Sequence, residues 1–75
     1  MTTDATTVTH TGQVEAYDPV RGWGTILGAD GARLGFHCTQ IADGSRGIPV
    51  GVTVRYARVP GHLGTWEAAA VAVIP

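Results

Sequence analysis

The stretch that decides the fold is Arg21-Gly22-Trp23-Gly24-Thr25-Ile26, which we interpret as an extended strand. Successive side chains of a strand alternate between its two faces, so Trp23 and Thr25 share one side. The other side holds the two glycines and Ile26, and it is almost bare backbone. Glycine inside a strand marks a sharp bend or a close approach of another chain, so this side suits the concave surface of a small barrel. The convex side then displays Trp23.

A second stretch, Leu34-Gly35-Phe36-His37-Cys38, follows after a short connection. The same alternation turns Leu34 and Phe36 inward and His37 outward. If the two stretches pair as neighbouring strands, Trp23 and His37 lie on one exposed surface.

The remaining strands follow from alternating polar and apolar residues bounded by turn residues. Strands are predicted at 12–17, 23–28, 33–38, 52–59 and 67–74, with turns at Asp18-Pro19, Asp30-Gly31 and Pro60-Gly61. The Ala- and Val-rich last run fits helix or strand by composition, and its short length and β context favour a strand. Residues 39–49 show no strand alternation and predict a short helical turn followed by a long exposed loop. The core is predicted to contain Tyr17, Leu34, Phe36, Ile41, Val54, Tyr56 and Val71.

The length of 75 residues allows one small domain. A hydrophobic fraction of 44% with 15% charged residues is typical of a globular chain and argues against disorder. Residues 1–11 are rich in Thr and lack apolar periodicity, so we expect a flexible N-terminal arm there and a folded domain over 12–75. Five short strands favour an all-β fold, a five-stranded antiparallel barrel, because closure removes exposed sheet edges.

The formal net charge is −1, and all five basic residues are Arg. This balance gives no global attraction to nucleic acid or anionic membranes, although a local basic face is compatible with it. The single cysteine, Cys38, excludes an internal disulfide. No apolar run approaches membrane-spanning length, and the N-terminus lacks the features of a signal peptide, so we expect a soluble cytoplasmic protein without membrane association.

Taken in order, these patterns resemble the bacterial cold-shock domain. The resemblance is carried by Gly12-x-Val14-x-x-Tyr17, Arg21-Gly22-Trp23-Gly24-x-Ile26, Asp30-Gly31, Phe36-His37, Ile41, Gly51-x-x-Val54 and Glu67-Ala68-Ala69-x-Val71. Its most specific part is the basic-Gly-aromatic-Gly pattern, which stands where that family has its first ribonucleoprotein motif; the second motif falls on 34–38. The resemblance implies an OB-type barrel that binds single-stranded RNA or DNA, without catalysis, cofactor or metal.

Binding of this kind stacks unpaired bases on several aromatic rings, each worth about 1–3 kcal/mol, while basic side chains follow the phosphates. The chain departs from the family at most of these positions. The family's first-strand Lys and Trp are replaced by Glu15 and Ala16, its motif rings by Thr25, Gly35 and Cys38, and its loop ring by Ser45-Arg46. Glu15 is expected to repel phosphate. The resemblance therefore predicts weak or atypical binding.

The predicted nucleic-acid-binding residues are Arg21, Trp23, Thr25, His37 and Trp66. Trp66 is included because the loop between the last two strands lines the ligand groove of OB folds. Each has a plainer interpretation. Trp23 can lie over a neighbouring surface, Arg21 can be a solvated loop charge, His37 a hydrogen-bonded side chain and Trp66 a cap on the barrel. Three further arginines, Arg46, Arg55 and Arg58, are candidates for a basic rim.

Other classes of site find little support. Cys38 and the three histidines match no metal-ligand spacing, and neighbouring His37 and Cys38 point to opposite faces of a strand, which excludes a paired nucleophile. Gly22-x-Gly24 lacks the third glycine and the helix of a dinucleotide fingerprint. We therefore expect no enzyme and no metal or cofactor. The second hypothesis for function is a barrel that has lost its nucleic-acid face and mediates protein association, as a homodimer or with another partner.

Overall fold

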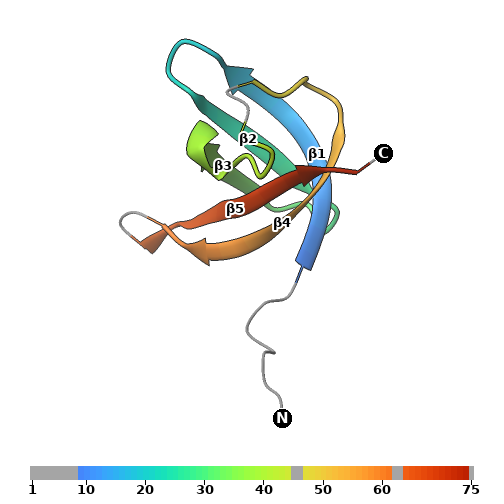
Figure 1. Ribbon diagram of the computed structural model, residues 1–75. Coiled ribbons are helices and arrows are strands. Elements are labelled where there is room, and N and C mark those ends of the chain that lie inside the picture. Colours follow the sequence, from blue (N-terminus) through green and yellow to red (C-terminus); the bar gives the residue numbers. More distant parts are fainter. Residues whose placement is uncertain (1–8, 45–46, 62–63, 75) are drawn as a thin grey trace.

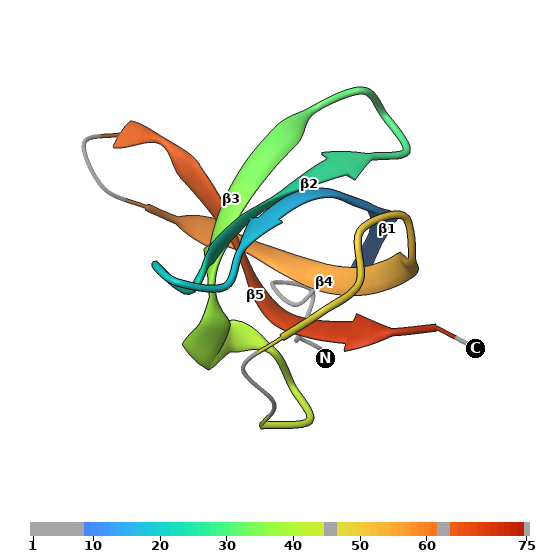
Figure 2. The same cartoon turned by 90° about the horizontal axis from the view of Figure 1, so that it is seen from above.

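The structure, a computed structural model, describes residues 9–44, 47–61 and 64–74. These residues form five strands and a short 3-10 helix, in the order β1 (Thr9–Asp18), β2 (Trp23–Gly28), β3 (Arg33–His37), η2 (Cys38–Gln40), β4 (Thr53–Pro60) and β5 (Trp66–Val73). Figure 1 shows β1, β2 and β3 connected by short turns and the β4–β5 hairpin crossing the other side of the molecule. Figure 2 shows the same arrangement from above.

The strands close into a barrel in the order β1-β2-β3-β5-β4. The predicted five-stranded all-β barrel is confirmed, but the prediction that it is antiparallel needs a correction. β3 and β5 run parallel, paired through Gly35 and Glu67 and extended by a parallel bridge between Ile41 and Val71. The reason is a matter of counting. An odd number of strands cannot alternate in direction all the way round a closed ring, so one seam must be parallel.

β2 has the predicted bounds, and the other four strands differ from the prediction by one to three residues at one or both ends. β1 begins at Thr9 rather than Gly12, because Thr9–Thr11 pair with β4 beyond the point where β2 ends. β3 ends at His37, because Cys38 already belongs to η2. Residues 1–8 of the predicted arm lie outside the described residues, so the division into arm and domain stays a prediction.

The core lies inside the barrel, where Ile26, Phe36, Val54 and Val71 are fully buried. The predicted core residues Leu34, Phe36, Ile41, Val54, Tyr56 and Val71 are all buried, and half-buried Tyr17 packs against them. The bare concave side of β2 is also confirmed. A Cβ at Gly24 would lie 2.6 Å from the Phe36 ring, so this glycine makes room for a large, fully buried side chain.

Tyr56 is expected to make the barrel less stable at alkaline pH. Burial raises the pKa of the Tyr56 phenol, and the nearby Asp30 carboxylate raises it further. The folded pKa thus exceeds the unfolded value of about 10, so stability is lost as pH rises from the unfolded towards the folded value. We expect Tyr56→Phe to flatten this alkaline decline in urea denaturation measured at increasing pH. An equally steep decline in the variant would contradict the assignment.

Candidate nucleic-acid interface

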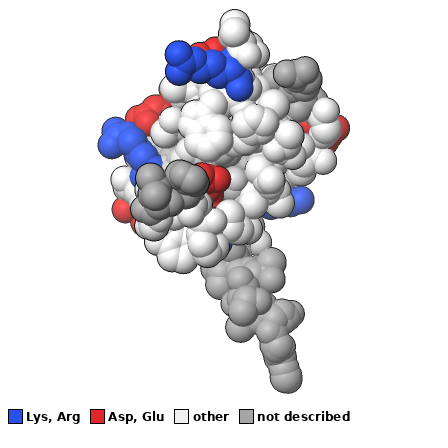
Figure 3. All heavy atoms as spheres, turned by 90° about the vertical axis from the view of Figure 1, so that its left-hand side faces the viewer, with Lys and Arg blue, Asp and Glu red and all other residues white. Residues whose placement is uncertain are grey.

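The outward-pointing residues of β1, β2 and β3 form one convex surface, which we call the Trp23 face. Its paired residues make three rows: Asp18–Trp23–His37, Ala16–Thr25–Gly35 and Gln13–Leu27–Arg33. The expected pairing of Trp23 with His37 is confirmed, and Thr25 occupies the next outward position along β2. Figure 3 looks onto the side at the left of Figure 1 and shows a stretch of uncharged surface bordered by basic and acidic side chains.

The indole of Trp23 lies across β3, over Gly35. A Cβ at Gly35 would lie 2.8 Å from Cζ2 and 3.2 Å from Nε1 of this ring. The side chain is nevertheless 41% exposed, so the ring packs on one face and is open to solvent elsewhere. Both interpretations of Trp23 from the sequence therefore hold. The lack of a side chain at Gly35 is what leaves room for the indole over β3.

His37 stands beside this platform with its ring centroid 6.0 Å from that of Trp23 and its plane tilted by 56°. Its Nδ1 accepts the backbone N–H of Thr39 at 3.3 Å and lies 2.9 Å from Thr39 Oγ1, so the imidazole caps η2. The plainer interpretation, a hydrogen-bonded histidine, is thus confirmed. The same contacts hold the imidazole ring of His37 in place beside Trp23.

Gly22 joins the start of β2 to the end of β3. Its φ of 68° lies in the left-handed region, and its carbonyl accepts the backbone N–H of Cys38 at 2.7 Å. A Cβ at Gly22 would lie 2.8 Å from Cys38 Sγ, so the two residues are in tight contact. Since Trp23 follows Gly22 and His37 precedes Cys38, this contact holds the two rings together.

The arginines around the face each meet a carboxylate. Arg21 Nε lies 3.8 Å from Asp18 Oδ2, and Asp18 is itself held in the turn because its Oδ1 accepts the backbone N–H groups of Val20 and Arg21. Arg33 Nε donates to both carboxylate oxygens of Glu15, at 2.9 and 3.0 Å. The hydrogen bond that Arg33 donates to this carboxylate raises the pKa of Arg33 above its already high value.

Arg33 is the member of this surface that the sequence reasoning missed. Glu15 sits in the register shift of β1 between Val14 and Ala16, and its carboxylate reaches Arg33 on β3. No local sequence signal indicates this pairing. The expectation that Glu15 repels phosphate must therefore be adjusted, because Arg33 compensates the charge of its carboxylate.

The structure does not place Trp66 in the rows of the Trp23 face. Trp66 begins β5, and the next residue, Glu67, pairs with Gly35 of the face. Because successive side chains of a strand point to opposite faces, the side chain of Trp66 points to the face opposite that of Glu67. Trp66 is 53% exposed, and the guanidinium carbon of Arg58 lies 5.7 Å from the centroid of its ring.

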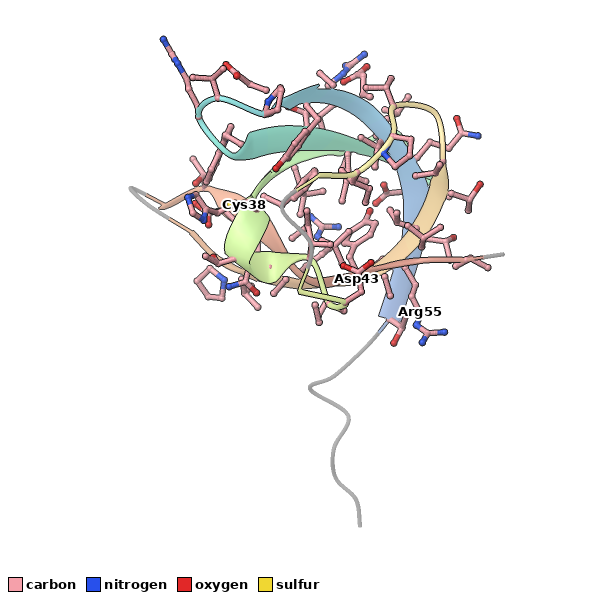
Figure 4. The ribbon with its side chains drawn as sticks, turned by 45° about the horizontal axis from the view of Figure 1, so that its top comes forward. Cys38, Asp43 and Arg55 are labelled. Atoms are coloured by element: carbon pink, nitrogen blue, oxygen red, sulfur yellow. The ribbon has the colours of Figure 1, made fainter. Side chains whose placement is uncertain are left out.

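The expected basic rim is only partly present. Arg58 Nη1 lies 3.4 Å from Asp30 Oδ2. The pKa of the Asp30 carboxyl group is lowered by the hydrogen bond from the backbone N–H of Ala32 and also by the charge of Arg58. Arg55 projects from β4, well away from Cys38 at the end of β3 (Figure 4). Arg46 and its neighbour Ser45 lie outside the described residues.

The comparison with solved structures identifies the architecture. A structure described as "drosophila Unr CSD456", which contains cold-shock domains, superposes with a TM-score of 0.77 at 23% sequence identity, covering 92% of this chain. The barrel has a cold-shock fold. This chain spans 28% of the length of the matched chain. No protein-family model matches the sequence, and no curated protein matches it.

Two further observations concern membranes and metals. None of the helices in the described part of the chain is long and apolar enough to cross a membrane. Within residues 9–44, 47–61 and 64–74, no three His, Cys, Asp or Glu side chains gather in a way that could hold a metal ion.

Proposed function

We propose that this protein binds single-stranded RNA or DNA weakly and without catalysis, by stacking an unpaired base on Trp23. OB folds bind oligonucleotides on the face of their second and third strands and with the adjoining loops. In this barrel that face carries the exposed indole of Trp23 beside His37. This ring pair, placed on the binding face of a cold-shock fold, is the observation that supports the proposal.

The number of stacking rings on this surface also determines the expected affinity. One stacked base contributes about 1–3 kcal/mol, whereas a dissociation constant of 1 mM corresponds to about 4 kcal/mol. A single indole platform therefore predicts affinities in the millimolar range or weaker. Such sites become effective when several act on one strand, because linkage raises the local concentration.

Replacement of Trp23 by Ala is expected to weaken oligonucleotide binding by roughly 5- to 150-fold, which is the loss of one stacked base. The measurement is quenching of tryptophan fluorescence by short single-stranded DNA and RNA for the wild type, and nuclear magnetic resonance shift titration for the variant. Trp66→Phe is the matched control, because it removes the other indole and leaves Trp23 as the reporter.

Two outcomes would count against the proposal. Full affinity in the Trp23→Ala protein would show that another face binds. An absence of quenching at the highest attainable oligonucleotide concentration, at low salt, would remove nucleic acid as the ligand.

A second candidate function is association with another copy of this chain through the same surface. The observation that favours it is the pairing of Arg21 and Arg33 with carboxylates beside the uncharged second row of Ala16, Thr25 and Gly35. Sedimentation velocity over a range of concentrations tests it. A barrel that remains monomeric at the highest concentration contradicts this alternative.

A further inference from the structure

We infer that the Trp23 face recognises one unpaired base at a time, as at a bulge or a chain end, with almost no contribution from phosphates. This inference rests on the proposed function and names the form of its ligand. It differs from binding of an extended strand, in which successive bases occupy successive rings and the phosphates meet basic side chains.

The first argument is that the Trp23 ring covers two positions of the face, its own and that of Gly35. The indole of Trp23 covers Gly35, and a Cβ there would already lie 2.8 Å from Cζ2. Position 35 is therefore filled from β2 and cannot offer a second platform. Its row neighbours, Thr25 and Ala16, have no rings. Among the described residues of the three rows, stacking is confined to the first row.

The second argument is that His37 cannot extend the platform. Its plane is tilted by 56° to that of Trp23, so a base stacked flat on the indole meets His37 at its edge. His37 thus adds no second stacking surface beside Trp23.

The third argument concerns charge. Arg33 donates to both oxygens of Glu15, so a phosphate would have to displace a carboxylate from it. The contact between Arg21 and Asp18 is looser, at 3.8 Å, but Asp18 is fixed in the first row by its turn hydrogen bonds and would repel a phosphate bound there. Arg58 is likewise next to Asp30. Few phosphate contacts mean few released counterions.

The test compares ligand length and salt in the Trp66→Phe protein, whose fluorescence reports on Trp23. The probes are thymidine monophosphate, the thymidine dinucleotide and the thymidine hexanucleotide. We expect quenching by all three, with affinities per nucleotide that agree within roughly threefold, since each ligand fills one stacking site. The slope of log K against log salt should be shallower than about −0.7, the value for one phosphate contact on a single strand.

The outcomes separate this inference from the proposed function. Quenching by the hexanucleotide alone, or a salt slope of about −0.7 or steeper, which means at least one phosphate contact, overturns the single-base inference and leaves nucleic-acid binding intact. An absence of quenching by every probe overturns both.

Glu15→Gln tests the charge argument directly. The substitution leaves Arg33 without its carboxylate partner, so the guanidinium becomes available to a phosphate. We expect the salt slope for the hexanucleotide to steepen by about 0.7, one phosphate contact. The slope of the protein with Glu15 intact, measured in the same buffers, is the reference for this change. Equal slopes in Glu15→Gln and the wild type would overturn the role given to this ion pair.

Discussion

Replacing Phe36 by Ala is expected to lower the free energy of unfolding by about 3–5 kcal/mol, the usual cost of emptying the site of a buried aromatic ring. Phe36 is 0% exposed, and its ring stacks on that of Tyr17 with centroids 6.0 Å apart. It also fills the space that Gly24 leaves open on the neighbouring strand. A domain of 75 residues has a total stability of about 4–11 kcal/mol, so this one substitution removes a large part of it.

Urea denaturation followed by tryptophan fluorescence measures this loss. Phe36→Leu is the milder companion, expected to lose less stability because it leaves a smaller cavity, and it keeps the test informative if the Ala variant does not fold. Val20→Ala is the surface control, because Val20 is 90% exposed and its truncation should change stability little. A Phe36→Ala protein as stable as the Val20→Ala protein would show that the ring does not fill the core as described.

Replacing Gly22 by Ala is the second large effect, expected at about 2–5 kcal/mol. Roughly 1–2 kcal/mol comes from forcing a side chain into the left-handed backbone conformation at φ 68°. About 1–3 kcal/mol more comes from the new methyl group, which would lie 2.8 Å from Cys38 Sγ and must push it aside. Because this contact holds Trp23 next to His37, we also expect weaker base stacking in the variant.

Two comparisons separate these contributions. Gly31→Ala has a φ of 89° with no atom within 4 Å of the new Cβ, so it carries the backbone strain alone. Adding Cys38→Ala to the Gly22→Ala protein should recover the steric part and leave the strain. If Gly22→Ala and Gly31→Ala lose equal stability in urea denaturation, the proposed collision with Cys38 is wrong.

The main surfaces of the barrel were predictable because they depend on a local property of the backbone. Alternation along a strand fixes which side chains share a face, and this placed Trp23 and His37 together and Phe36 inside. The strand count followed from the same alternation and from the turn residues between the strands. The parallel seam between β3 and β5 was not foreseen, although closing five strands into a ring requires it.

The parts that escaped prediction depend on contacts between distant residues. The reach of Glu15 to Arg33 depends on a register shift in β1 that no local motif marks. The direction of the Trp66 side chain depends on the register between β3 and β5, which is set by closure of the whole barrel. The position of the Trp23 ring over Gly35 is a choice of side-chain rotamer, and alternation does not determine it.

The parallel seam has a consequence for how the barrel moves. Within the described residues, β3 and β5 are joined by the single ladder pair of Gly35 with Glu67 and by the Ile41–Val71 bridge, whereas each of the other seams has five or six residue pairs. Local opening follows the line of fewest hydrogen bonds, so amide exchange should be fastest along this seam. A base held on Trp23 sits directly over Gly35, at the edge of that line. A bound base would then stabilise the part of the barrel that opens first.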